Sequence, residues 1–308
     1  MTMRLYALLA LGLVAPALGG TARAAGESAV AAGAAGAVAD AGSSSRETRK
    51  RAEAAVPLDH MAAAERRTAE EAIARTTLYR RLPAASVACD AALLDFVLQK
   101  PETLVDVWRV LGISRLALDP SGAGRWRLSD GYGTVGTVQL LHQERTDHGG
   151  VYVFHGRGAY EGPLAPRQLT GSCLVVVRHA AAPLAAGGRP RRTVHIDAFL
   201  DVDGIGLEIV TRTLQPLIVR SAAANLHEIS LFVTQFAAAA ARNPAAVARI
   251  AERMSRTDPQ DRRTLVVLAS GRDGGTPGPA TRQPAAEDVQ SELAARWMPA
   301  DQLEAARR

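Results

Sequence analysis

The sequence predicts an α+β protein built on an antiparallel sheet that is followed by a long helix. Three observations predict this class. Two short stretches with helical spacing of apolar residues open the body of the chain, six stretches with period-two alternation follow, and helical spacing then returns. No helical pattern interrupts the six alternating stretches. Because strands joined by turns pair with their neighbours in antiparallel order, we expect a six-stranded meander.

The two short helices before the sheet are expected at residues 90–98 and 101–111. Pro101 suits the first position of the second helix, and Glu102 is favourable near its positive end. Apolar residues recur there at three- and four-residue spacing, and Gly112 closes the helix. The chain should therefore enter the sheet from a pair of helices.

The alternating stretches end where Asp203-Gly204 predicts a turn. The six expected strands lie at residues 114–118, 125–128, 137–141, 151–154, 172–177 and 194–200. Helical spacing resumes near Leu207, and a long helix is expected up to residue 241. Asn243 and Pro244 then have the residue types of an N-cap and a first helical position.

The N-terminus has the pattern of a signal peptide over residues 1–24. Arg4 supplies the positive charge, an apolar stretch follows, and Ala22-Arg23-Ala24 matches a cleavage site. The apolar run is shorter than a bilayer span requires. We therefore expect an exported protein, periplasmic or secreted, with no stable membrane span, and an uncleaved anchor is the alternative.

The remaining segments predict one domain with two flanks. Residues 25–59 are rich in Ala, Gly and Ser, which predicts a disordered linker, and residues 60–84 predict a marginal helix. The domain itself is expected at residues 85–255. Residues 256–308 are expected to form a C-terminal extension with a Gly/Pro-rich linker and a short helix.

Composition excludes several classes of protein. Of 308 residues 47% are hydrophobic, which is enough for a core, and the formal charge is +5. Only Lys50 and Lys100 are lysines, so the high isoelectric point reflects arginine, and we expect no nucleic-acid partner. Two cysteines, Cys89 and Cys173, exclude a disulfide-dense scaffold, and whether they pair is left open. We expect no cofactor.

Two motifs resemble binding sites but have simpler explanations. Residues 131–136 match G-x-G-x-x-G, yet a strand follows where a dinucleotide site needs a helix, so a glycine-rich hairpin is expected. His142, Glu144, Asp147 and His148 could bind a metal, but two of them fall in a polar turn. We expect a solvated turn there and no metal site.

Two pairs of polar residues remain as weaker candidates. His155 and Glu161 could act as acid and base at a cavity mouth, or belong to an edge hairpin. His195 and Asp197 share one face of a strand. We expect that pair to face solvent, because a buried charge is costly unless it is paired.

The order of elements over residues 88–242 resembles the START-like (SRPBCC, helix-grip) superfamily. The residues that carry the resemblance are the final strand at 195–202, the Asp203-Gly204 turn and the helix at 214–241. The segments at 101–108 and 156–162 also resemble a group of uncharacterised exported bacterial proteins. The superfamily implies a curved sheet wrapped around the long C-terminal helix, with an apolar cavity between them.

We therefore expect an exported domain that binds a lipid or other hydrophobic small molecule. The residues expected at its ligand are Tyr152, Phe154, Tyr160, Phe199, Leu226, Ile229 and Phe236. One alternative is a cyclase- or hydrolase-type enzyme that uses His155 and Glu161. A second is a structural envelope-interaction protein without a pocket. Ligand identity and oligomeric state lie beyond the sequence.

Overall fold

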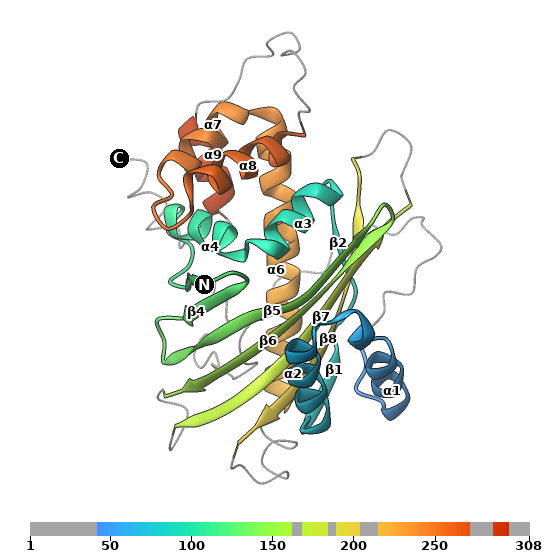
Figure 1. The fold of residues 1–308 in the computed structure, drawn as a ribbon. Helices are drawn as coiled ribbons and strands as arrows, with labels where there is room; N and C mark the ends of the chain where they lie inside the picture. Colours follow the sequence, from blue (N-terminus) through green and yellow to red (C-terminus); the bar gives the residue numbers. More distant parts are fainter. Residues whose placement is uncertain (1–41, 162–167, 184–188, 204–214, 272–285, 296–308) are drawn as a thin grey trace, which may run out of the picture.

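An eight-stranded antiparallel sheet organises the chain, and helices cover both of its faces (Figure 1). The computed structural model describes residues 42–161, 168–183, 189–203, 215–271 and 286–295. For residues 215–221 and 286–288 it describes the backbone alone. Within these ranges the chain forms eight α-helices, one 3-10 helix and eight strands. The predicted α+β class with an antiparallel sheet is confirmed.

The strands follow one another as a meander from β3 to β8. Every neighbouring pair is antiparallel, and the order across the sheet is β1-β8-β7-β6-β5-β4-β3, with β2 also paired to β8. The bounds are β1 (Leu78–Arg81), β2 (Ala85–Val87), β3 (Ala117–Gly122), β4 (Arg125–Ser129), β5 (Thr134–Thr146), β6 (Gly149–Tyr160), β7 (Leu169–Ala181) and β8 (Arg192–Val202).

The predicted number of six strands is wrong, because β1 and β2 add an interrupted strand at the edge beside β8. Leu78 pairs with Leu200, and Val87 pairs with Arg192 at the other end. Pro83 lies between the two short strands and has no N–H to donate, so the ladder breaks there. The segment 60–84, expected to hold only a marginal helix, therefore ends in a strand.

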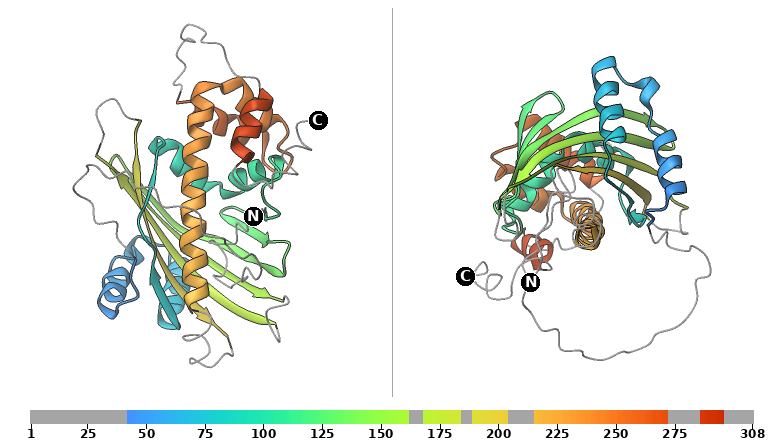
Figure 2. Two further views of the ribbon diagram at one scale, coloured as in Figure 1. Left: turned by 180° about the vertical axis from the view of Figure 1, so that it is seen from behind. Right: turned by 90° about the horizontal axis from the view of Figure 1, so that it is seen from below.

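Six helices lie on one side of the sheet or beyond its end (Figure 2). They are α3 (Ala91–Gln99), α4 (Pro101–Val110), α6 (Gln215–Arg242), α7 (Pro244–Glu252), α8 (Pro259–Ser270) and α9 (Ala286–Ala295). All six contribute to one hydrophobic core with the sheet face that carries Tyr152 and Phe154. Figure 2 shows α6 running along this face.

The expected C-terminal extension belongs to the body of the protein. The 28-residue helix α6 is followed by α7, α8 and α9, so it is not the last helix. Asp106 of α4 accepts hydrogen bonds from the backbone N–H groups of Arg256 and Thr257 at 2.9 and 3.1 Å. Leu265 of α8 is 1% exposed within the core. Residues 256–270 thus pack against the domain, which corrects the expected boundary at 255.

The opposite face of the sheet is covered by α1 (Arg46–Ala54), η1 (Leu58–His60) and α2 (Ala63–Ala74). Ser45 caps α1 by accepting a hydrogen bond from the backbone N–H of Thr48. Ala52 and Ala69 are fully buried in a second hydrophobic core with Phe199. The disordered linker expected at 25–59 is therefore wrong for residues 46–59, which hold α1 and most of η1.

A buried carboxylate anchors this helical layer to the sheet. Asp197, with a side chain 1% exposed, accepts hydrogen bonds from Tyr79 at 2.6 Å, from Arg81 at 2.9 and 3.0 Å and from Arg178 at 2.8 Å. Arg178 also donates to the carbonyl of Ala55 at the end of α1. The expectation that Asp197 faces solvent is wrong, because two arginines and a tyrosine compensate its burial.

The glycine-rich motif forms the turn between β4 and β5. Gly131 and Gly133 have φ values of 71° and 108°, which L-residues with side chains avoid. Asp130 accepts hydrogen bonds from the backbone N–H groups of Tyr132 and Thr134 at 2.7 and 2.9 Å. The motif thus lies within a hairpin, as the sequence predicts, and strand β5 follows where a dinucleotide site would have a helix.

Several predicted features lie outside the described residues. They are the signal peptide at 1–24, most of the linker at 25–41, the start of helical spacing at 207–214 and the Gly/Pro-rich segment at 272–285. Among the helices within the described ranges, none combines the length and hydropathy needed to cross a bilayer.

Replacing Asp197 by Asn should lower the free energy of unfolding by about 2–4 kcal/mol, because two partly buried guanidinium groups lose their counter-charge. Urea denaturation at neutral pH measures this change. The control is Asp119→Asn, which removes one partner of an ion pair whose side chains are 47% and 46% exposed. The control should cost less than about 1 kcal/mol. Equal effects of the two variants would contradict the anchoring role.

Candidate functional site

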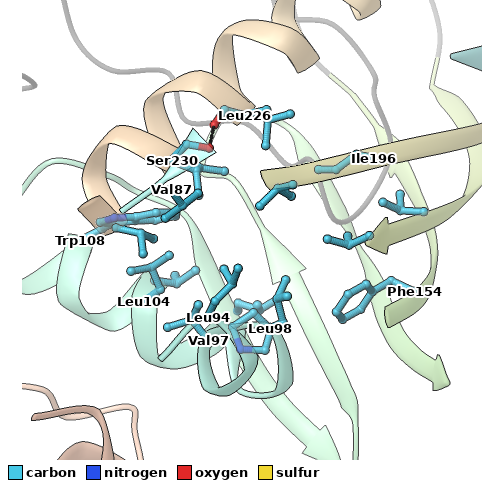
Figure 3. A pocket seen from close by; sticks show the side chains of 18 of the residues that line it. Val87, Leu94, Val97, Leu98, Leu104, Trp108, Phe154, Ile196, Leu226 and Ser230 are labelled. Atoms are coloured by element: carbon cyan, nitrogen blue, oxygen red, sulfur yellow. Dashed lines mark hydrogen bonds between the residues drawn. The ribbon is translucent and has the colours of Figure 1, made fainter. Parts of the chain in front are cut away.

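A cavity of about 140 Å³ lies between the sheet and helices α3, α4 and α6 (Figure 3). Its wall combines short aliphatic side chains of the strands with leucines of the helices. The described residues that line it are Val87, Leu94, Val97, Leu98, Pro101, Leu104, Val105, Trp108, Leu116, Leu118, Leu128, Phe154, Val175, Val177, Val194, Ile196, Leu226, Ile229, Ser230 and Val233.

The lining of the cavity is almost entirely apolar. Ser230 is its one described hydroxyl, and that hydroxyl donates to the carbonyl of Leu226 at 2.7 Å. Trp108 contributes an indole whose ring meets Phe232 edge to face at 5.8 Å. The buried Nε1–H of Trp108 has no hydrogen-bond partner among the described residues. An apolar lining of this kind favours apolar molecules over water.

The volume restricts what the cavity can hold. An engineered protein cavity of about 150 Å³ binds benzene or xenon, whereas pockets for drug-sized ligands span roughly 300–1,000 Å³. At about 140 Å³ the present cavity matches a single small ring or a short alkyl group.

Three of the seven residues expected at a ligand line this cavity, namely Phe154, Leu226 and Ile229. Tyr152 and Phe236 belong to the same core but not to the cavity wall. The hydroxyl of Tyr152 donates to Asp95 at 2.6 Å, and Phe236 stacks on Phe232. Neither side chain therefore belongs to the described wall.

The other two expected residues lie elsewhere. Tyr160, 3% exposed, is at the end of β6 and outside the cavity wall. Phe199 is on the opposite face of the sheet, where it packs against Tyr79 with ring centroids 5.2 Å apart. Phe199 is thus a core residue beneath the α1–α2 layer. It does not contribute to the cavity wall.

Most of the wall comes from elements that the sequence-based list omits. Helices α3 and α4 supply Leu94, Val97, Leu98, Leu104 and Trp108. Their apolar stripes are visible in the sequence and predict burial. The spacing alone does not distinguish a residue that fills a core from one that borders a cavity.

The proposed acid–base pair does not converge on the cavity. His155 follows Phe154 on β6, so its side chain points to the opposite face of the sheet. Burial lowers the pKa of His155, and the charge of Arg157 lowers it further. Glu161 is exposed at the end of the same strand. The geometry therefore does not support catalysis by this pair at the cavity.

A buried polar network connects α3 to the sheet. Asp95 of α3 accepts hydrogen bonds from Tyr152 at 2.6 Å and from Nε2 of His179 at 2.7 Å. Arg192 donates to Nδ1 of His179 at 3.1–3.3 Å. Because arginine only donates, Nδ1 of His179 must accept this hydrogen bond. The Nε2–H group of His179 is then the donor of the hydrogen bond to Asp95. This chain of bonds connects α3 to three adjacent strands.

The network requires a glycine at position 150. A Cβ atom there would lie 2.7 Å from Nε2 of His179 and 3.2 Å from Oδ1 of Asp95. Both separations are shorter than ordinary packing contacts, so a side chain would displace the hydrogen-bonded groups. Its members are buried and hydrogen-bonded to one another. The network therefore ties α3 to the sheet.

Neither cysteine has the character of a nucleophile. Cys89 and Cys173 are both buried, and they do not form a disulfide. Burial raises the pKa of each thiol to about 12. At neutral pH both thiols are therefore protonated and behave as small apolar side chains.

Comparison with known proteins gives no family or activity. No family model matches the chain, and no curated protein matches it. Among solved structures, a conserved protein from Geobacillus kaustophilus overlaps 48% of this chain and 92% of its own, at 10% identity and a TM-score of 0.29. The Mll3558 protein from Rhizobium loti overlaps 48% and 95%, at 19% identity and a TM-score of 0.27.

A third structure, of an uncharacterised protein from Rhizobium leguminosarum, overlaps 48% of this chain and 94% of its own. It has 12% identity and a TM-score of 0.24. At such low TM-scores we draw no conclusion about fold or function from these overlaps.

Replacing Asp95 by Asn should destabilise the protein by about 1–3 kcal/mol at pH 7, because the acceptor of two buried donors is weakened. Burial raises the pKa of Asp95, but the hydrogen bonds from His179 and Tyr152 outweigh it, and the net pKa is lowered. Because the pKa of Asp95 is lower in the folded protein, its charged carboxylate stabilises the fold at neutral pH. This stabilisation is lost as the pH falls through the pKa of Asp95 in the folded state.

The difference in unfolding free energy between the native protein and Asp95→Asn should therefore shrink at acid pH. Urea unfolding at pH 7 and at pH 3 measures it. Asp147→Asn, in the exposed β5–β6 turn, is the control and should change little at either pH. A difference that stays constant or grows on acidification would contradict the charged state of Asp95.

Proposed function

We propose that the protein is an exported binding domain that holds a small apolar molecule, or the apolar end of a larger one. The observation that supports this most directly is the cavity beneath α6, with its apolar wall and its single described hydroxyl. Aliphatic and aromatic walls are typical of small-molecule sites. The apolar area that a ligand buries would supply its affinity, at about 25 cal/mol per Å².

The proposal includes a helix-grip arrangement of the START-like kind, in which a curved sheet wraps around α6. Two observations support it. The N-terminal strands β1 and β2 pair with β8, the last strand of the meander. Helix α6 lies over the same sheet face that borders the cavity (Figure 2). Export is part of the proposal and depends on the signal-peptide pattern at residues 1–24.

The volume sets the class of ligand that we propose. A cavity of about 140 Å³ accommodates a six-atom ring, which can gain at most about 9 kcal/mol, from the ceiling of about 1.5 kcal/mol per non-hydrogen atom. A complete lipid exceeds the volume. We therefore propose that a lipid ligand would insert only a ring or a short alkyl end, with its polar part outside.

Two Phe→Ala variants test the proposal as a matched pair. Phe154 lines the cavity, whereas Phe199 lies on the opposite face of the sheet. Both side chains are at most 1% exposed. Each substitution should cost about 3–5 kcal/mol. Only Phe154→Ala enlarges the cavity, so only this variant should gain affinity for a larger ring.

Thermal unfolding is measured for the native protein and both variants with benzene and with naphthalene. The native protein should be stabilised by benzene, Phe154→Ala by both compounds, and Phe199→Ala by benzene alone. Absence of stabilisation in the native protein and in Phe154→Ala would contradict a ligand cavity. That result would favour an interaction protein with a filled interior. If Phe154→Ala does not fold, Phe154→Leu serves in its place.

A further inference from the structure

Three side chains with metal-binding atoms meet on the outer face of the sheet, beneath η1. His60 comes from η1, and His142 and Glu144 come from β5, more than 80 residues away in sequence. The Nδ1 atom of His60 lies 3.1 Å from Oε2 of Glu144, and Nε2 of His142 lies 3.7 Å from the same oxygen. The three ligand atoms all lie within 4.8 Å of one another.

A bulge in β5 directs His142 to this face. Leu140 pairs with Phe154 on the cavity side, but the register then shifts, and His142 pairs with Val153. Val153 belongs to the second hydrophobic core, beneath the α1–α2 layer, so His142 faces that side of the sheet. Glu144 pairs with Val151 and faces the same side. In an uninterrupted strand, His142 would share the cavity face with Leu140. Bulges often redirect a side chain in this way next to functional sites.

The Nε2 atom of His142 has no hydrogen-bond partner among the described residues. The atom is buried, and it is one of the few buried side-chain nitrogens without a partner in the described part of the chain. Its distance of 3.7 Å from Glu144 is too long for a hydrogen bond. Buried polar atoms are nearly always satisfied, so an orphaned imidazole nitrogen beside a carboxylate and a second imidazole points to a missing partner.

We propose that His60, His142 and Glu144 form a site for a divalent transition-metal ion, with Zn²⁺ as the best match. Two imidazoles and one carboxylate are a known zinc ligand set. Ligand atoms of a tetrahedral zinc site lie about 3.3 Å apart, from metal–ligand distances of about 2.0–2.1 Å. The separations of 3.1 and 3.7 Å bracket this value.

The exposure and the atom types of the three side chains agree with a transition-metal ion that remains accessible to solvent. The side chains of His60 and Glu144 are 64% and 43% exposed, whereas that of His142 is 11% exposed. Three protein ligands leave a fourth position for water. Imidazole nitrogens disfavour Mg²⁺ and Ca²⁺, which prefer oxygen ligands.

The site excludes the other two residues of the sequence cluster. Asp147 and His148 lie in the exposed turn between β5 and β6 and are not part of the group of three. The ion would instead join η1 to β5, where His60 and Glu144 already share an exposed hydrogen bond. Metal binding should therefore also stabilise the fold.

The test is isothermal titration of the full chain, free of any histidine tag, with Zn²⁺, together with the visible absorption of bound Co²⁺. The native protein should bind one ion, and Co²⁺ should give the strong absorption of a low-coordinate site. Three ligand variants are compared, namely His60→Ala, His142→Ala and Glu144→Gln. Loss of a residue that only supports a metal ligand weakens binding about 10- to 100-fold, and each ligand variant should weaken Zn²⁺ binding by more than that. Zn²⁺ should raise the unfolding temperature of the native protein but not that of the three ligand variants.

The matched controls are His148→Ala and Asp147→Asn, which remove the same residue types from the same hairpin. Both should bind Zn²⁺ as the native protein does. The proposal is overturned if the native protein binds no ion, if the controls lose binding as the ligand variants do, or if the ligand variants keep it. Circular dichroism verifies that each variant is folded, and Glu144→Gln, which preserves side-chain shape, keeps the test decisive if His142→Ala unfolds.

Discussion

The central strands carry apolar side chains on both faces, and this one constraint determines the arrangement of the helices. On β7, Val175 and Val177 point to one face, and Leu174 and Val176 point to the other. A strand of this kind exposes apolar surface unless both faces are covered. Helices α3, α4 and α6 cover one face, and the layer of α1, η1 and α2 covers the other (Figure 2).

The two faces are closed in different ways, and their candidate functions differ accordingly. Helices α3, α4 and α6 lie over one side and leave a cavity of about 140 Å³ against the strands. The layer of α1, η1 and α2 lies over the other side, where the carboxylate of Asp197 binds Arg81, Arg178 and Tyr79. Apolar binding is therefore proposed on one face and metal binding on the other, and neither proposal depends on the other.

Local patterns in the sequence predict much of the sheet, but they do not predict which face is which. Alternation places His195 and Asp197 on one face and Val194 and Ile196 on the other, and the latter pair does line the cavity. Alternation does not reveal that α1 would cover Asp197. The same limit explains why Phe199 lies away from the cavity. An aromatic side chain is a reasonable ligand contact, but the alternation of β8 places Phe199 on the opposite face, in the second hydrophobic core.

Two further errors have local causes that spacing rules do not capture. Pro83 divides the edge strand into two segments, each too short to show alternation. The bulge between Leu140 and His142 changes the face of every later residue in β5, so the partners of His142 could not be predicted. His60 joins them through tertiary structure alone. By contrast, the helices at 90–98 and 101–111 and the hairpin at Gly131–Gly136 carry strong local signals.

The most direct test of the account is crystallography of the protein under xenon pressure, because xenon enters dry apolar cavities of this size. The account predicts an ordered xenon atom bordered by Leu104, Phe154 and Ile229, between the sheet and helices α3, α4 and α6. A filled interior at this position, with xenon absent or bound only elsewhere, would contradict it.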